Sequence, residues 1–83
     1  MVRIVAVKAI EPYRIWIRFA DGLEGTIDLS ELVGQGVFQR LVDPTEFTQV
    51  YVDRETHTVA WPGGIDLCPD TLYEDIREQQ RAA

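Results

Sequence analysis

The stretch "YRIWIRFADGLEGTIDL", residues 13–29, contains two alternating apolar patterns that meet at a turn. Side chains alternate between the two faces of a strand. Residues 13–19 therefore place Tyr13, Ile15, Ile17 and Phe19 on one face and Arg14, Trp16 and Arg18 on the other. Residues 23–29 repeat the pattern, with Leu23, Gly25, Ile27 and Leu29 on one face. The stretch predicts an antiparallel hairpin with one apolar face.

The length of the turn follows from the same alternation. A two-residue loop at Asp21 and Gly22 would pair Phe19 with Glu24 and mix the faces, whereas a three-residue loop over 20–22 pairs Phe19 with Leu23. Gly22 suits the left-handed position that three-residue loops need. The resulting register pairs Ile17 with Gly25, Arg18 with Glu24, Trp16 with Thr26 and Arg14 with Asp28. It predicts two cross-strand ion pairs, each worth about 0.2–1 kcal/mol.

Further strands are expected on both sides of this hairpin. Residues 2–9, rich in Val and Ile, predict a first strand. Residues 47–53 contain a fourth strand with Val50 and Val52 inward, followed by a four-residue loop at 54–57. Residues 58–61 predict a fifth strand with Val59 and Trp61 inward, and the turn at 62–64 pairs Trp61 with Ile65 in a short sixth strand, 65–67.

Helical signals lie between and after the strands. Asp28 or Ser30 can cap a short helix at "SELV", residues 30–33, and "VFQRLV", residues 37–42, predicts another helical turn. Asp43 followed by Pro44 is a helix start of about one turn. Residues 70–80 predict a C-terminal helix with Leu72, Tyr73 and Ile76 on one face.

These elements predict an α+β fold in a single small domain spanning residues 1–83. It comprises a mainly antiparallel sheet of five to six strands in two hairpin groups, a short helical connector in the middle and a C-terminal helix. Residues 2–76 form the expected ordered core, with fraying over 77–83.

Composition excludes several classes of function. The net charge of −6 and the pI of about 4.5 argue against direct nucleic-acid binding, because such affinity comes largely from Lys and Arg neutralising phosphates. The single cysteine cannot form an internal disulfide, and no apolar run approaches the roughly 20 residues that span a bilayer. The N-terminus, interrupted by Arg3 and Lys8, does not match a signal peptide. We therefore expect a cytoplasmic protein with no membrane association.

The stretch "AWPGGIDLCPDTLYEDI", residues 60–76, is rich in reactive groups but has a full structural explanation. Trp61 anchors the core, Asp66 points away from it, and Asp70 or Thr71 caps the C-terminal helix. Cys68 is expected to be a small, buried or half-buried hydrophobe. The stretch therefore predicts a joint between strands and helix.

Catalytic and metal chemistry lack the residues that they need. The only histidine, His57, lies in a predicted loop away from Cys68, which leaves the cysteine without a base. One cysteine and one histidine are too few for a zinc site, and the glycines of "GQG", residues 34–36, are expected to break a helix. We predict no catalytic residue, cofactor or metal; the competing hypothesis is a small enzyme using the carboxylates Asp66 and Asp70.

The best candidate binding surface is the outer face of the sheet. Trp16 lies between Arg14 and Arg18 there, and Tyr51, Ala60 and Asp66 are expected to point outward from the second hairpin. Trp, Tyr and Arg are enriched in binding hot spots. The candidate protein-binding residues are Arg14, Trp16, Arg18, Tyr51 and Asp66. The alternative is that the C-terminal helix or a loop covers Trp16 and makes it part of the core.

Several motifs resemble a known family. The order "DG", "IDL", "F…V.VD…TVAWPGGIDL.PD.LYE" is similar to the bacterial domain of unknown function 2442, over about Val2 to Glu74. Its most specific part runs from Trp61 to Tyr73. The resemblance implies a compact α+β domain without an established activity. Some members of that family continue into a helix-turn-helix domain, and others are encoded beside another small protein in a toxin–antitoxin-like arrangement.

The sequence and the resemblance together predict a non-catalytic, protein-binding module, with the resemblance adding the idea of one half of a toxin–antitoxin-like pair. The expected partner is another protein, and self-association stays open because a strand edge can pair with a second copy. Besides the enzyme, the remaining alternative is a transcription-associated regulator that acts through a partner.

Overall fold

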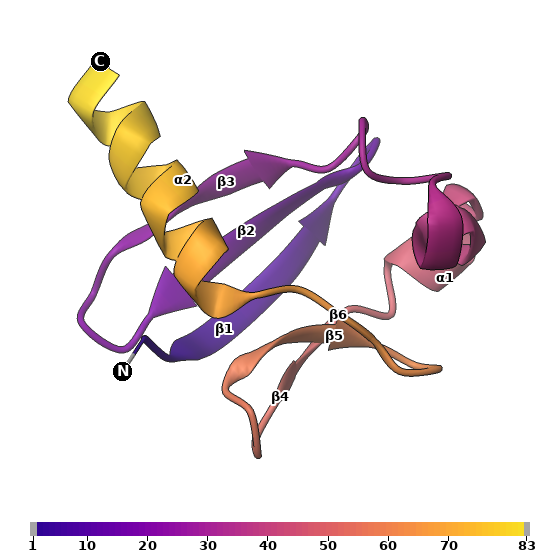
Figure 1. Ribbon diagram of the computed structural model, residues 1–83, viewed down its shortest axis with the longest axis horizontal. Coiled ribbons are helices and arrows are strands. Elements are labelled where there is room, and N and C mark those ends of the chain that lie inside the picture. Colours follow the sequence, from indigo (N-terminus) through magenta and orange to yellow (C-terminus); the bar gives the residue numbers. More distant parts are fainter. Residues whose placement is uncertain (1, 83) are drawn as a thin grey trace.

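Two three-stranded antiparallel sheets and a C-terminal helix make up the protein, a computed structural model that describes residues 2–82. Sheet A consists of β1 (Ile4–Ile10), β2 (Arg14–Phe19) and β3 (Glu24–Asp28), in that order. Sheet B consists of β4 (Tyr51–Asp53), β5 (Thr58–Trp61) and β6 (Ile65–Asp66), also in sequence order. This arrangement is the predicted α+β fold with two hairpin groups (Figure 1).

The β2–β3 hairpin has the predicted register. Ile17 lies opposite Gly25, and the Phe19 N–H donates to the Leu23 carbonyl at 2.7 Å. Gly22 adopts φ +94°, so glycine relieves backbone strain in the three-residue loop. Of the two predicted ion pairs, Arg18–Glu24 forms, with 3.0 Å between Nε and Oε2. The Arg14–Asp28 pair does not form.

The reason is local hydrogen bonding on both partners. Arg14 Nη2 donates to the Glu11 carbonyl at 3.0 Å, and Asp28 Oδ1 accepts from the Ser30 N–H at 2.8 Å. Short-range bonds of this kind compete well with a solvent-exposed ion pair.

The pairing of β1 with β2 contains a register shift. Ile4 lies opposite Phe19, but from Ala6 onward the pairing with β2 moves by one residue, so Val5 is the unpaired residue of a bulge and is 55% exposed. The bulge turns Ile4 into the core while Ala6 faces the opposite side of the sheet. β1 also borders sheet B, because the Ile4 N–H donates to the His57 carbonyl at 2.8 Å.

The connector between the sheets differs from the prediction in its first part. Residues 30–34 form turns instead of the expected helix at "SELV". The Leu32 and Val33 N–H groups both donate to the Leu29 carbonyl, which makes one turn, and Gly34 at φ +97° ends it before a second turn forms. The 3₁₀ helix η1 (Gly36–Val42) follows. Helix α1 (Pro44–Phe47) begins as predicted, with Asp43 accepting from the Thr45 N–H at 2.9 Å.

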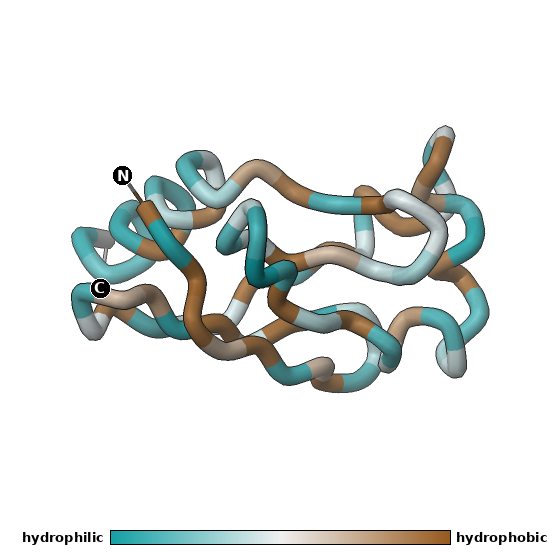
Figure 2. The backbone as a smooth tube through the Cα atoms, turned by 90° about the horizontal axis from the view of Figure 1, so that it is seen from below, coloured by the Kyte–Doolittle hydropathy of each residue, from teal (hydrophilic) through white to brown (hydrophobic). Residues whose placement is uncertain are grey.

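Helix α2 (Pro69–Ala82) covers one face of sheet A (Figure 1). It extends two residues past the predicted end at residue 80. Of residues 77–83, for which fraying was predicted, 77–82 belong to the helix, and residue 83 lies outside the described residues. Its buried residues, Leu72 and Ile76, are on the predicted apolar face, while most of the helix is hydrophilic (Figure 2). A β-carbon at Gly25 would lie 3.0 Å from Ile76 Cγ2, so glycine lets helix and sheet approach closely.

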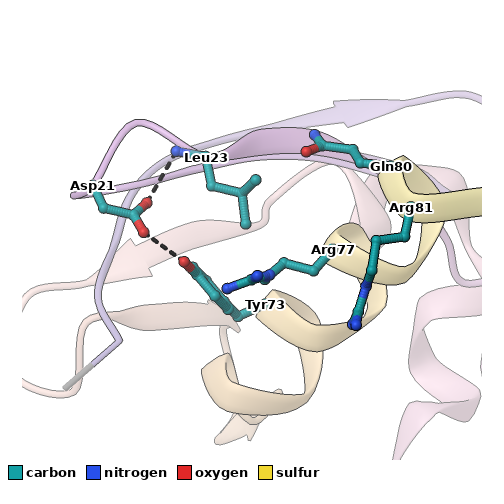
Figure 3. A pocket seen from close by; sticks show the side chains of 6 residues that line it. All are labelled: Asp21, Leu23, Tyr73, Arg77, Gln80 and Arg81. Atoms are coloured by element: carbon teal, nitrogen blue, oxygen red, sulfur yellow. Dashed lines mark hydrogen bonds between the residues drawn. The ribbon is translucent and has the colours of Figure 1, made fainter.

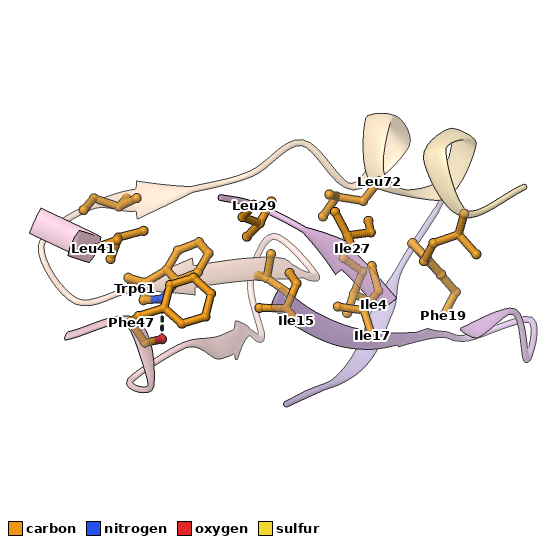
Figure 4. Close-up of a cluster of buried hydrophobic side chains, with 13 residues drawn as sticks. Ile4, Ile15, Ile17, Phe19, Ile27, Leu29, Leu41, Phe47, Trp61 and Leu72 are labelled. Atoms are coloured by element: carbon orange, nitrogen blue, oxygen red, sulfur yellow. Dashed lines mark hydrogen bonds between the residues drawn. The ribbon is translucent and has the colours of Figure 1, made fainter. Parts of the chain in front are cut away.

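The core lies between sheet A, sheet B and α2 (Figure 4). Trp61 and Phe47 pack at one end and Phe19 at the other, with Ile15 and Ile17 between them. Trp61, the predicted anchor, is 1% exposed, and its Nε1 donates to the Phe47 carbonyl at 2.8 Å. Every buried side-chain nitrogen and oxygen within residues 2–82 has a hydrogen-bond partner, as native cores require.

Candidate functional site

The face of sheet A opposite α2 is the candidate site. Cross-strand partners share a face of a sheet, and the observed register places nine residues on this one. We call them the outer face: Ala6, Lys8, Ile10, Arg14, Trp16, Arg18, Glu24, Thr26 and Asp28. The opposite face carries Ile15, Ile17 and Phe19, each 1% exposed or less.

Trp16 occupies the centre of the outer face. It lies opposite Lys8 on β1 and Thr26 on β3, and it is half-buried. It does not belong to the hydrophobic cluster or to the residues packed against it. The Arg18 Cζ lies 5.4 Å from the Trp16 ring, within cation–π range. Trp16 was expected either on the outer face of the sheet or in the core beneath the C-terminal helix or a loop. In the structure it lies on the outer face, and α2 packs on the opposite face of sheet A.

Charges on the outer face differ from those of the remaining chain. Lys8, Arg14 and Arg18 oppose Glu24 and Asp28, which gives the face a net charge of +1. Since the whole chain carries −6, the rest carries −7. The cations lie on β1 and β2, whereas both carboxylates lie on β3.

Asp28 is held at the edge of this face by its neighbour. The backbone N–H and then the hydroxyl of Ser30 lower the pKa of the Asp28 carboxyl, and Arg14 adds a smaller effect in the same direction. The ionised carboxylate is thereby favoured, so β3 keeps its negative charge at neutral pH.

The other predicted surface residues lie in sheet B. Tyr51 and Asp66 flank Ala60 across the strands, and both are exposed as expected, Tyr51 at 44%. Ala60 was expected to point outward but is 5% exposed, because it lies on the central strand between two larger neighbours. The structure therefore brings Arg14, Trp16 and Arg18 together and puts Tyr51 and Asp66 in a different sheet.

Cys68 corrects the prediction of a buried or half-buried hydrophobe. The residue is exposed and directly precedes α2, whose first turn includes the Leu72 N–H donating to the Cys68 carbonyl at 3.2 Å. The backbone N–H and then the hydroxyl of Thr71 lower the pKa of the Cys68 thiol. A helix start leaves backbone donors open to solvent, and the side chain before it faces them.

A second feature, which sequence reasoning missed, joins the β2–β3 loop to α2 (Figure 3). Tyr73 Oη donates to Asp21 Oδ2 at 2.6 Å, and the other carboxylate oxygen accepts from the Leu23 N–H at 3.0 Å. Both bonds lower the pKa of Asp21, the one from Tyr73 most, and the same bond raises the pKa of Tyr73. We call this contact the Asp21–Tyr73 bond; no local pattern links two residues 52 positions apart.

An open hollow of about 430 Å³ lies beside the Asp21–Tyr73 bond. Arg77, whose Cζ is 5.9 Å from the Tyr73 ring, and Arg81 line it (Figure 3). Arg81 Nη2 forms an ion pair with Glu78 Oε1 at 3.0 Å, so a carboxylate of the same helix offsets the charge of Arg81. The hollow lies where α2 meets the β2–β3 loop, and Asp21 and Glu78 offset part of the charge of its two arginines.

The part of the chain that the structure describes holds no group of three or more His, Cys, Asp or Glu side chains placed to bind a metal ion. Within the same residues, no helix combines the length and apolarity that crossing a bilayer demands.

Comparison with known families agrees with the motifs. The model of the family described as "Protein of unknown function (DUF2442)" matches residues 4–78. The chain belongs to the DUF2442 family. The match covers nearly all of the elements described above, from the start of β1 into α2, and confirms the resemblance that "WPGGIDL" indicated. No curated protein matches the chain.

A solved structure shares the fold. The crystal structure of putative DNA-binding protein NE0471 from Nitrosomonas europaea ATCC 19718 matches with a TM-score of 0.79 and 22% sequence identity. The match covers 96% of this DUF2442 chain and 52% of NE0471, so the chain spans about half the length of that protein. At this identity the likeness concerns the fold alone.

Proposed function

We propose that this DUF2442 protein is a non-catalytic module that binds another protein through the outer face of sheet A. The observation that carries the proposal is the position of Trp16. It is a half-buried aromatic residue at the centre of a sheet face on the side opposite α2, and it lies outside the core cluster. Trp and Arg are the residues that most often dominate binding energy in protein interfaces.

The competing enzyme hypothesis has weaker support. Asp66 is exposed at the end of β6, and Asp70 is exposed in the first turn of α2. General acid–base catalysis depends on groups whose surroundings tune them and exclude water. If the enzyme hypothesis held, replacing both residues by Asn would abolish the cellular effect of the protein while leaving its fold intact.

The direct test is an affinity pull-down of tagged protein from its own cells, read by mass spectrometry. We expect one stoichiometric partner with wild type, loss of that partner with Trp16→Ala, and retention with Tyr51→Ala. Tyr51→Ala is the matched control because it removes an exposed aromatic side chain from the other sheet. Retention in Trp16→Ala, or no partner with any bait, would reject the outer face.

The toxin–antitoxin-like role is part of this proposal. This role predicts that the captured partner is the product of a neighbouring gene. It also predicts that co-expression of the two proteins relieves the growth arrest that one of them causes. A partner encoded elsewhere, with no effect on growth, would remove that role and leave the binding module in place.

A second candidate is a regulator that reaches DNA through its partner. Its support is the shared fold with NE0471, whose name refers to DNA binding, over about half of that protein. The net charge of −6 disfavours direct contact with DNA. A gel shift at low salt should therefore show no retardation by the isolated chain and retardation only when the captured partner is added.

A further inference from the structure

We infer that the partner of the outer face is a protein segment of a different chain that places carboxylates around an apolar side chain seated on Trp16. This inference rests on the proposed function and specifies the chemistry of the partner. It follows from how the three cations and two carboxylates are arranged about Trp16.

The nine residues of the outer face form three rows across the strands. The first row is Ala6, Arg18 and Glu24, the middle row is Lys8, Trp16 and Thr26, and the last row is Ile10, Arg14 and Asp28. Lys8, Arg14 and Arg18 therefore surround Trp16 on three sides, and Thr26 closes the fourth.

Most of this positive charge is available to a partner. Lys8 forms no ion pair within residues 2–82, and Arg14 donates to a backbone carbonyl instead of a carboxylate. Only Arg18 is paired, with Glu24 at 3.0 Å. Because the rest of the chain carries −7 while this face carries +1, an acidic partner meets less repulsion here than the net charge of the chain would impose.

A second copy seated symmetrically on Trp16 is disfavoured. A two-fold axis parallel to the strands places Arg14 on Arg14 and Arg18 on Arg18 of the other copy. An axis across the strands places Arg14 on Arg18 and Lys8 on Lys8, and either diagonal axis places Lys8 on an arginine. Every symmetric docking centred on Trp16 thus brings like charges together, which costs free energy in a desolvated interface.

Nucleic acid is disfavoured by the third strand. A phosphate backbone carries charge along its whole length, and crossing the face brings it against Glu24 and Asp28 on β3. A protein segment avoids this repulsion by placing its carboxylates over β1 and β2 alone. Arg14 and Arg18 are four residues apart, about 13 Å along the strand, so the carboxylates flank the apolar residue on either side.

Site-specific photocrosslinking in the native cells tests the inference. A photoreactive phenylalanine analogue replaces Thr26, which adjoins Trp16, and a control carries it at Glu55, an exposed residue of the β4–β5 turn. We expect an adduct from position 26 alone, with a peptide from another protein that has a clear excess of Asp and Glu.

Charge reversal provides the second readout. Lys8→Glu with Arg14→Glu should lower the adduct yield at least tenfold. Arg54→Glu, which makes the same charge change per site in the β4–β5 turn, should leave the yield unchanged. Circular dichroism and urea unfolding confirm that each variant folds.

The outcomes separate the inference from the function on which it rests. A peptide without acidic excess, a nucleic-acid adduct, a second copy of this chain, or a yield insensitive to Lys8→Glu/Arg14→Glu would overturn the inference while the outer face remains a binding surface. The absence of any adduct at position 26 would overturn the proposed function itself.

Discussion

The two tryptophans of this chain occupy opposite settings although both lie on strands in alternating patterns. Trp61 is 1% exposed, packs against Phe47 with 5.8 Å between ring centroids, and donates a buried hydrogen bond. Trp16 is half-buried outside the core and has a guanidinium near its ring. The comparison shows that a large aromatic residue on a strand is buried or left at the surface according to whether other elements cover its face of the sheet.

The largest expected contrast is in stability. Trp61→Ala should lower the free energy of unfolding by about 3–5 kcal/mol, because it creates a cavity and leaves a buried carbonyl unpaired. Trp16→Ala should cost less than about 1 kcal/mol, as is usual for residues outside the core. Urea unfolding followed by circular dichroism measures both, and equal losses would contradict the comparison.

The two faces of β3 should respond differently to small changes in side-chain size. Gly25→Ala puts a β-carbon 3.0 Å from Ile76 Cγ2 and should cost about 1–3 kcal/mol through overpacking. Thr26→Ala, on the outer face, should stay within about 0.5 kcal/mol. Combining Gly25→Ala with Ile76→Val should recover part of the loss. Additive effects in that double variant would show that α2 does not press on Gly25.

Fluorescence distinguishes the two tryptophans without a large change in stability. Trp61→Phe leaves Trp16 as the emitter, and its spectrum should be red-shifted and quenched several-fold more by acrylamide than that of Trp16→Phe. The physical reason is solvent access to a residue outside the core. A blue-shifted, poorly quenched Trp16 in folded Trp61→Phe would mean that something covers the outer face.

The two cross-strand charge pairs should differ in coupling. A double-mutant cycle on Arg18 and Glu24 should give about 0.2–1 kcal/mol at low salt, falling towards zero at high salt because the pair is exposed. The same cycle on Arg14 and Asp28 should give a smaller value, from through-space attraction alone, since each side chain hydrogen-bonds elsewhere. Equal coupling for both pairs would contradict this arrangement.

The smallest effect concerns pH. The pKa of Asp21 is lowered in the fold, so its contribution to stability is present above the unfolded pKa and is lost as pH falls through the folded value. The pKa of Tyr73 is raised, so its contribution is present below about pH 10 and is lost as pH rises through the folded value.

The Asp21–Tyr73 bond should account for part of both pH dependences. Tyr73→Phe should flatten the alkaline loss and weaken the acid one, measured as urea midpoints from pH 2.5 to 11. Asp28→Asn is the matched control, since it removes a carboxylate with a lowered pKa that makes no contact with α2. An unchanged acid limb in Tyr73→Phe would show that Asp21 is held by its loop alone.

Much of the fold was predictable from local patterns. Alternation set the register of both hairpins, including the three-residue loop with Gly22 and the pairing of Trp61 with Ile65. Asp43 and Pro44 marked α1, and the spacing of Leu72 and Ile76 marked the buried side of α2. Each of these signals works over fewer than about fifteen residues, where strand alternation, helix period and turn chemistry act directly.

Other features depended on packing between distant segments. "IVAV" at residues 4–7 is apolar without alternation, so only pairing with β2 and contact with sheet B decide that Val5 bulges and Ile4 turns inward. Cys68 is exposed because α2 begins at the next residue, and Asp21 meets Tyr73 only because α2 crosses the hairpin.

In the candidate site, too, local patterns predict some features and packing between distant segments decides the others. By itself the sequence determined that Arg14, Trp16 and Arg18 share one face of a strand, because alternation is a property of the backbone. Only the tertiary structure decided that this face lies opposite α2, that Lys8 joins it through the bulged first strand, and that Tyr51 and Asp66 belong to another sheet. Those outcomes depend on which apolar surfaces are buried against each other, and burial is settled by the whole chain at once.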